Sequence, residues 1–252
     1  NNPTELKKPN WIKVKAPTSK QYNDTLNLVK KYNLHTVCQE AACPNIGECW
    51  SKKHATFMIM GDVCTRACGF CDVKTGKPGS LDWEEPKRVA ESVNTMGLSH
   101  AVITSVNRDD LNDGGSLFFA ETIREVKKFN NGCDVEVLIP DFKGDRAAIS
   151  NIIDASPEVI NHNLETVPRL QREIRTSASY GRSLSLLHYV KSQGFEGKTK
   201  TGLIVGMGES KEEVIAVLKD ISKLDVDIVT IGQYLRPTAK HRPIDRYAPE
   251  EE

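Results

Sequence analysis

The stretch TFMIMGDVCTRACGFC, residues 56–71, joins a short apolar run to three closely spaced cysteines. The run at residues 56–60 has the length and the apolar character of a buried strand. Cys64, Cys68 and Cys71 follow it and are separated by three and then by two residues. A strand that leads directly into a group of thiols places a candidate chemical site at the carboxyl end of that strand.

Five further runs of this kind alternate with helical patterns along the chain. The runs cover residues 100–104, 135–139, 158–163, 200–205 and 227–231, and the helical patterns cover residues 84–96, 114–129, 145–154, 165–192 and 210–222. Alternation of near-continuous apolar strands with helices is typical of parallel βα units, whose sheet is covered on both faces. Six units predict an α/β fold, a partial, open (β/α)6 barrel preceded by an N-terminal extension. A doubly wound sheet is the alternative, because periodicity alone does not separate the two.

Two helix starts carry local signals. Residues 22–34 have a modest apolar stripe, and Asn23 or Asp24 is the expected N-terminal cap. Ser210 and Glu213 have the spacing of a capping box, which predicts a helix that begins just after Ser210.

Composition narrows the class of protein. The 252 residues include 34 Lys and Arg and 34 Asp and Glu, so the formal net charge is zero. This balance gives no electrostatic reason to expect nucleic acid or a membrane surface as the main partner. No apolar run approaches the roughly 20 residues of a membrane span, and no signal-peptide pattern is visible at the N-terminus. We therefore expect a cytoplasmic globular protein with no nucleic-acid or membrane partner.

Cysteine usage points to metal chemistry. Six of the seven cysteines lie between residues 38 and 71, and only Cys133 stands apart. In a reducing compartment, clustered thiols are more often metal ligands than disulfides. Cys38, Cys43 and Cys49 form a second triplet, spaced C-x4-C-x5-C.

Each cysteine set is a triplet, which matters for the choice of metal. Structural zinc usually takes four ligands in closed pairs, so a zinc site here would need spare thiols or a histidine such as His35 or His54. A [4Fe–4S] cluster binds thiolates through its irons, and three cysteines leave one iron free for another ligand. Spacing favours iron–sulfur clusters and leaves zinc as the alternative.

The polar loops after the expected strands supply further candidates. Function in parallel βα folds lies at the carboxyl ends of the strands. Thr104 and Ser105 follow the second strand, and Asn163 and Glu165 follow the fourth. Asn163 and Glu165 have a structural alternative as a cap that opens the next helix.

The motifs together resemble a known family. The pattern C-x3-C-x2-C, with Phe70 before its last cysteine and placed after the first strand of a (β/α) barrel, resembles the radical S-adenosylmethionine (SAM) superfamily. CQEAACPNIGEC (38–49), VITSVNRDDLNDGG (102–115), INHNLETVPRL (160–170) and IGQYLRPT (231–238) resemble the lipoyl synthase family in particular. This resemblance covers nearly the whole chain.

The resemblance implies an activity and its cofactors. It implies two [4Fe–4S] clusters: one on Cys64, Cys68 and Cys71 that binds SAM, and an auxiliary one, held by Cys38, Cys43 and Cys49, that is the sulfur source. The implied activity is that of a sulfurtransferase, with radical-mediated insertion of two sulfur atoms at C6 and C8 of a protein-bound N6-octanoyl-lysine and use of two SAM molecules. The family also carries an Arg-Ser-Ser-Tyr segment whose serine ligates the auxiliary cluster, and no such motif occurs in the printed sequence.

Partners and domains follow from the same resemblance, and the binding residues follow from it together with the chemistry and position of the side chains. We expect contacts to SAM from Phe70, Thr104, Ser105, Asn163, Glu165, Arg175 and Lys200, the last two as partners of the methionyl carboxylate. The expected partners are an octanoylated lipoyl carrier domain and an electron donor such as flavodoxin or ferredoxin. The expected divisions are an N-terminal cluster-binding extension (1–55), the barrel (56–235) and a C-terminal tail (236–252). A biotin-synthase-like enzyme and a zinc-stabilised binding module are the competing hypotheses.

Overall fold

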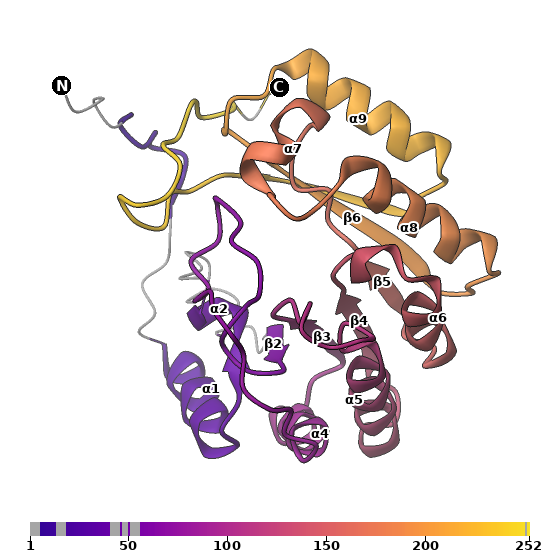
Figure 1. Ribbon diagram of the computed structural model, residues 1–252. Coiled ribbons are helices and arrows are strands. Elements are labelled where there is room, and N and C mark those ends of the chain that lie inside the picture. The colour runs from indigo at the N-terminus through magenta and orange to yellow at the C-terminus, as the bar shows by residue number, and fades with distance from the viewer. Residues whose placement is uncertain (1–5, 14–18, 41–45, 47–49, 51–55, 250) are drawn as a thin grey trace.

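The computed structural model describes residues 6–13, 19–40, 46, 50, 56–249 and 251–252. In this part of the chain seven strands form one sheet in the order β1 to β7, which is also their order along the sequence (Figure 1). β1 (His35–Thr36) is antiparallel to β2 (Thr56–Ile59). The remaining strands continue the sheet in parallel: β3 (His100–Ser105), β4 (Asp134–Leu138), β5 (Val159–Asn161), β6 (Lys198–Val205) and β7 (Ile228–Gln233).

This topology separates the two folds that periodicity left open. A doubly wound sheet reverses its strand order at a switch point, whereas here six parallel strands follow one another without reversal. Among the described strands, β1 and β7 are the two edges of the sheet, so the barrel is open. The partial (β/α)6 barrel is confirmed, and the doubly wound alternative is wrong.

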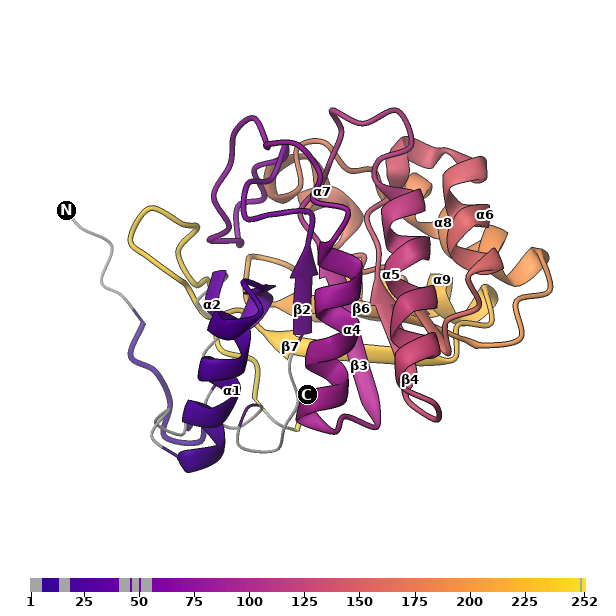
Figure 2. The same cartoon turned by 90° about the horizontal axis from the view of Figure 1, so that it is seen from below.

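Helices cover the outside of the curved sheet. α4 (Glu85–Met96), α5 (Ser116–Phe129), α6 (Arg146–Asp154), α8 (Tyr180–Ser192) and α9 (Lys211–Lys223) lie around the arc of strands in Figure 1, and α7 (Pro168–Ile174) precedes α8. A short 3₁₀ turn, η1 (Phe142–Gly144), leads into α6. In Figure 2, α1 (Lys20–Lys31) and the short α2 (Val37–Glu40) lie beside β2 and α4. No helix in the described residues is long and apolar enough to cross a membrane.

The helix boundaries agree with those predicted from the sequence, except at two places. The capping box of Ser210 and Glu213 is formed at the start of α9. α1 begins earlier than expected: Ser19 is its N-cap and accepts a hydrogen bond from the Tyr22 N–H, so the assignment of the cap to Asn23 or Asp24 was wrong. The expected helix at residues 165–192 is two helices, because the chain leaves helical geometry at Arg175 and starts again at Ser179.

The core lies between the sheet and its outer helices. Outward side chains of the strands, such as Ile103 on β3 and Val137 on β4, are fully buried, as is Phe119 on α5. The inward face differs. Glu136 on β4 and Lys200 on β6 both point into the barrel, where Lys200 donates a hydrogen bond to Glu136. The near-continuous apolar pattern therefore describes the outer face of β4, while the inner face carries polar groups as well.

Candidate functional site

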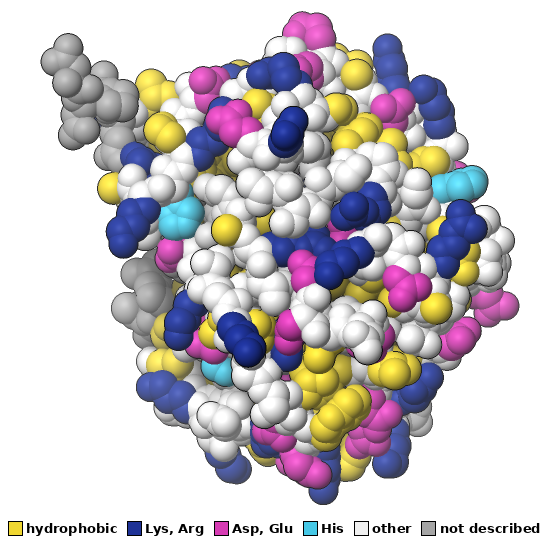
Figure 3. Space-filling view, viewed as in Figure 1, with side chains coloured by type: hydrophobic (Ala, Val, Ile, Leu, Met, Phe, Trp, Pro, Cys, Tyr) yellow, Lys and Arg dark blue, Asp and Glu magenta, His cyan; other side chains and the backbone are white. Residues whose placement is uncertain are grey.

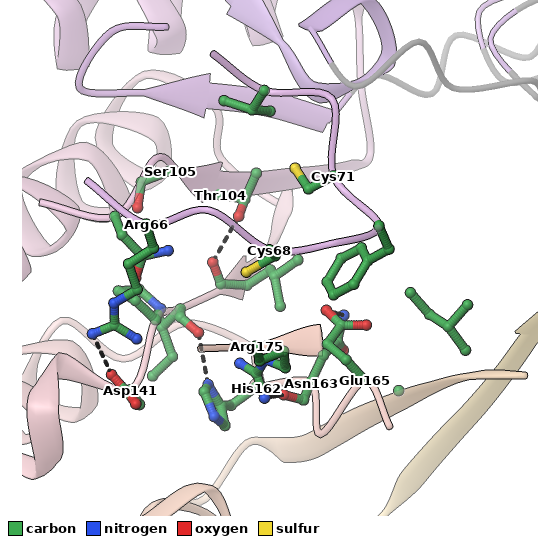
Figure 4. A pocket seen from close by; sticks show the side chains of 18 of the residues that line it. Arg66, Cys68, Cys71, Thr104, Ser105, Asp141, His162, Asn163, Glu165 and Arg175 are labelled. Carbon is green, nitrogen blue, oxygen red and sulfur yellow. Dashed lines mark hydrogen bonds and ion pairs between the residues drawn. The ribbon is translucent and has the colours of Figure 1, made fainter. Parts of the chain in front are cut away.

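A cavity of about 520 Å³ opens at the carboxyl ends of the parallel strands. Its walls come from β2, β3, β4, β6 and β7 and from the loops that follow β2 to β5 (Figure 4). The residues that line it include Cys64, Cys68, Cys71, Phe70, Thr104, Ser105, Asn163, Glu165 and Arg175, all predicted from the sequence. Parallel strands bring these distant segments together because their carboxyl ends lie at one edge of the sheet.

Backbone hydrogen bonds on both sides hold the cysteine loop. The Cys64 N–H donates to the Lys74 carbonyl at 2.8 Å, and the Gly69 N–H donates to the Ile174 carbonyl at 2.8 Å. Cys71 donates back to Cys68 across a turn at 3.1 Å. The bond to Ile174 places the middle of the loop at the break between α7 and α8, so this break receives the cysteine loop.

Burial raises the pKa of two thiols in this loop, those of Cys68 and Cys71. It raises the pKa of Cys68 to about 11, although the nearby Arg175 guanidinium opposes the rise. Burial also raises the pKa of Cys71. Metal ligands are thiolates, so metal binding at this loop has to release protons.

The cavity fits an iron–sulfur cluster together with a small polar molecule. Cys64, Cys68 and Cys71 are free thiols. Within the described residues, no three His, Cys, Asp or Glu side chains converge on a point where a single ion would bind. A cube binds each thiolate through a different iron, so its ligands do not need to converge in this way. Ser105 Oγ and Asn163 Oδ1 are buried and have no hydrogen-bond partner among the described residues, so a ligand with polar groups would satisfy them.

Residues after β5 form the polar side of the cavity. Glu165 has φ +64°, a left-handed conformation that costs energy for a residue with a side chain. Burial raises the pKa of its carboxyl group, and the Asn163 amide donates to it at 3.1 Å. Arg175 donates to the Asn163 and Leu164 carbonyls at 3.1 and 3.2 Å, which ties the loop after β5 to the end of α7.

Lys200 does not line the cavity. It is the third residue of β6, and its ammonium group donates to the Glu136 carboxylate at 2.7 Å. Its charge is therefore neutralised within the barrel by β4. The expectation that Lys200 pairs with the methionyl carboxylate has no support in this geometry.

The expected ligands of the auxiliary cluster are Cys38, Cys43 and Cys49. Cys43 and Cys49 lie outside the described residues, and Cys38 is placed only as part of α2. Their expected ligand role stays a prediction.

Sequence reasoning missed a group of buried charges beside the cysteine loop. Arg66 lies between Cys64 and Cys68, and its guanidinium bonds to Asp109 at 2.6 and 2.8 Å and to Asp141 at 2.7 Å. Burial works against ionisation of Asp141, but the hydrogen bond and charge of Arg66, helped by Arg182, lower its pKa to about 2. The signal was the position of Arg66 inside the cysteine triplet and of Asp141 in the loop after the third strand.

His162 is a further missed residue at the cavity wall. Its Nδ1 bonds to the Ile139 carbonyl at 2.8 Å and its Nε2 to the Ser183 hydroxyl at 2.8 Å. The carbonyl accepts, so Nδ1 carries the proton, and the neutral ring accepts from the hydroxyl at Nε2. Burial, with a contribution from the Arg175 charge, lowers the pKa of His162 to about 4.

His162 predicts an acid-sensitive fold. The unfolded chain binds a proton at this ring near pH 6.5, whereas the folded protein resists until about pH 4. The free energy of unfolding therefore has its full value above pH 6.5 and decreases as the pH falls to 4, by at most about 3 kcal/mol from this histidine. We expect His162→Gln to flatten the pH dependence of the unfolding free energy between pH 6.5 and 4, measured by urea denaturation. An unchanged slope in the variant would contradict this assignment.

Comparisons with known proteins agree with the geometry. The radical SAM superfamily model matches residues 58–221, and the model for the N-terminal domain of lipoyl synthase matches residues 1–43. The lipoyl synthase of Christiangramia forsetii is 54% identical over 97% of this chain and 83% of that protein. The mitochondrial lipoyl synthase of Nematostella vectensis is 52% identical over 97% of this chain and 84% of that protein, and the Rubrobacter xylanophilus lipoyl synthase is 55% identical over 95% and 75%.

Solved structures show the same fold at low identity. The FeFe-hydrogenase maturase HydG from Carboxydothermus hydrogenoformans has a TM-score of 0.62 at 14% identity, over 75% of this chain and 46% of that one. SuiB of Streptococcus suis, bound to S-adenosylmethionine, has a TM-score of 0.60 at 13% identity, over 91% of this chain and 50% of that one. By its sequence along nearly its whole length and by its open barrel, the chain belongs to the lipoyl synthase family within the radical SAM superfamily.

Proposed function

We propose that this chain inserts two sulfur atoms at C6 and C8 of an octanoyl chain attached to a lysine of a lipoyl carrier domain. The observation that carries the proposal is the cavity, which is lined by the three free cysteines of the C-x3-C-x2-C loop and by Ser105 and Asn163, whose Oγ and Oδ1 atoms lack a hydrogen-bond partner among the described residues. The identity of 52–55% to proteins named lipoyl synthase supports this substrate class.

The cavity residues divide into those that hold the cluster and those that hold the small molecule. Cys64, Cys68 and Cys71 are the proposed cluster ligands. When bound there, the cluster and SAM supply a one-electron cleavage that yields a hydrogen-abstracting radical. Phe70, Thr104, Ser105, Asn163, Glu165 and Arg175 are the proposed contacts to SAM, all of which line the cavity.

Each side of the cavity suits a different part of this chemistry. Ser105 and Asn163 offer polar atoms that the protein leaves free, and the buried Glu165 carboxyl group suits an amino group of the ligand. Met58, Leu138 and Ile204 supply an apolar part of the wall. Apolar walls help to keep water away from a reactive intermediate.

A second cluster completes the proposal. Cys38, Cys43 and Cys49 are its proposed ligands, and it is the proposed source of the inserted sulfur. We assign residues 1–55 to the extension that carries it, 56–235 to the barrel and 236–252 to a C-terminal tail. The match of residues 1–43 to the N-terminal lipoyl synthase domain supports this division.

The proposed partners are a carrier domain and an electron donor such as flavodoxin or ferredoxin, in the cytoplasm. On the face seen in Figure 3, Lys and Arg side chains lie next to Asp and Glu side chains, so both signs of charge are interspersed. A mixed surface favours recognition by local pairing rather than by a long-range field of one sign.

The test is turnover without oxygen. Purified protein, with clusters reconstituted, is incubated with SAM, a reductant and an octanoylated carrier domain, and the carrier is followed by mass spectrometry. We expect the mass gain of two sulfur atoms less the hydrogens they replace. A colourless protein that contains zinc but neither iron nor sulfide would support the binding-module alternative and refute this function.

A further inference from the structure

Arg66 is the centre of a buried ion-pair group that joins three loops. Its side chain is 6% exposed, and Asp141, one of its two partners, is fully buried. Asp109 belongs to the loop after β3, and Asp141 belongs to the loop after β4. Arg182 on α8 bonds to the second carboxylate oxygen of Asp141 at 3.0 Å. The guanidinium in the middle of the cysteine triplet is therefore held by charges that follow two other strands.

The backbone beside these charges reaches the first cysteine sulfur. Thr65 donates its N–H and its hydroxyl to the Asn107 carbonyl at 3.1 and 3.0 Å, and the Asp109 N–H donates to the Thr65 hydroxyl at 3.1 Å. Asn107 then directs its backbone N–H to Cys64 Sγ at 3.3 Å and its side-chain amide to the same atom at 3.7 Å. The Arg66 N–H approaches this sulfur at 3.4 Å.

Three N–H groups from two residues thus point at one cluster-ligand sulfur. Hydrogen bonds to the ligand sulfurs are among the factors that set the reduction potential of an iron–sulfur cluster. They stabilise negative charge on sulfur and so favour the reduced cluster. The loop after β3 makes two of the three contacts, and the two bonds from Arg66 to Asp109 fix that loop against the cysteine loop.

We propose that Arg66 is a positioning residue: by binding Asp109 and Asp141 it holds Asn107 against Cys64 and thereby raises the reduction potential of the cluster on Cys64, Cys68 and Cys71. The inference rests on the proposed cluster site and adds a device that tunes it. Groups that support metal ligands typically affect metal affinity or activity about 10–100-fold. We expect an effect of this size on SAM cleavage when Arg66 is lost.

The ion pair of Arg108 with Asp110, the residue next to Asp109, offers a matched control. Arg108 bonds to Asp110 at 2.8–3.3 Å, and its other contacts are to the Met60 and Gly79 carbonyls. This is also an ion pair of a buried arginine with a half-buried aspartate, in the same loop as Asp109. Asp110→Asn therefore removes comparable charge and loop stabilisation without touching the contacts of Arg66.

The experiment measures the cluster itself. Wild-type protein, Arg66→Lys, Asp109→Asn, Asn107→Leu and the control Asp110→Asn are reconstituted anaerobically, and the midpoint potential is determined by redox titration followed by electron paramagnetic resonance. We expect a more negative potential and a changed spectrum for the first three variants, and wild-type values for Asp110→Asn. Asn107→Leu removes the side-chain contact to Cys64 Sγ and leaves every ion pair intact, so its shift would not come from a broken ion pair.

The outcomes separate this inference from the proposed function. Variants that bind the cluster with the wild-type potential and spectrum would overturn the role of Arg66 and leave the proposed function standing. An equal shift in Asp110→Asn would also overturn it, because any loss of loop stability would then suffice. Wild-type protein that binds no iron–sulfur cluster would overturn the proposed function itself.

Discussion

Cys68→Ala is expected to abolish SAM cleavage. Cys68 lines the cavity together with Cys64 and Cys71. The backbone of its neighbour Gly69 is hydrogen-bonded to Ile174 at the α7–α8 break, which fixes the loop, so we expect no other thiol to take the place of Cys68. With two thiolates left, the cluster loses a ligand outright. The loss should exceed the roughly 10–100-fold effect of groups that merely support a ligand. The measurement is 5′-deoxyadenosine formed per protein under reducing, oxygen-free conditions.

Cys133→Ala is the matched control for that change. Cys133 is also a free cysteine, and it is buried, but it precedes β4 and so lies at the opposite end of the strands from the cavity. It serves as a small apolar side chain there. We expect this variant to cleave SAM at the wild-type rate. Cleavage that survives in Cys68→Ala, or that vanishes equally in Cys133→Ala, would contradict the assignment of Cys68 as a ligand.

Cys43→Ala is expected to separate the two halves of the reaction. The proposed cluster on Cys38, Cys43 and Cys49 donates sulfur and takes no part in breaking the sulfonium. The variant should therefore form 5′-deoxyadenosine at about the wild-type rate and form no lipoyl product. Both are measured in one reaction, the nucleoside by chromatography and the carrier by mass.

The result to look for is a carrier that keeps its octanoyl mass while SAM is consumed. Lipoyl product formed by Cys43→Ala at the parent rate would show that the first triplet does not supply sulfur. Loss of both activities would instead assign Cys43 to the radical step.

Local patterns in the sequence were sufficient for the elements and for the thiols. Six apolar runs became β2 to β7, because each run is short, apolar on its outer face and bounded by turns. The C-x3-C-x2-C loop was placed at a strand end by its position alone, and the capping box of Ser210 and Glu213 formed as its spacing predicted. These features depend on interactions between residues close together in the sequence.

Only the tertiary structure decided how the charged residues are paired. Lys200 was expected at the ligand, but it bonds to Glu136 two strands away, and Arg66 bonds to Asp141 across 75 positions. A sequence shows that a charge is present but does not show which partner lies within reach once strands curve into a barrel. Burial makes such pairing obligatory, because an unpaired charge inside the protein is too costly to keep. The sequence therefore determined the strands, the helices and the thiols, whereas the folded arrangement decided for the open barrel over the doubly wound sheet and determined which polar groups are left free for a ligand.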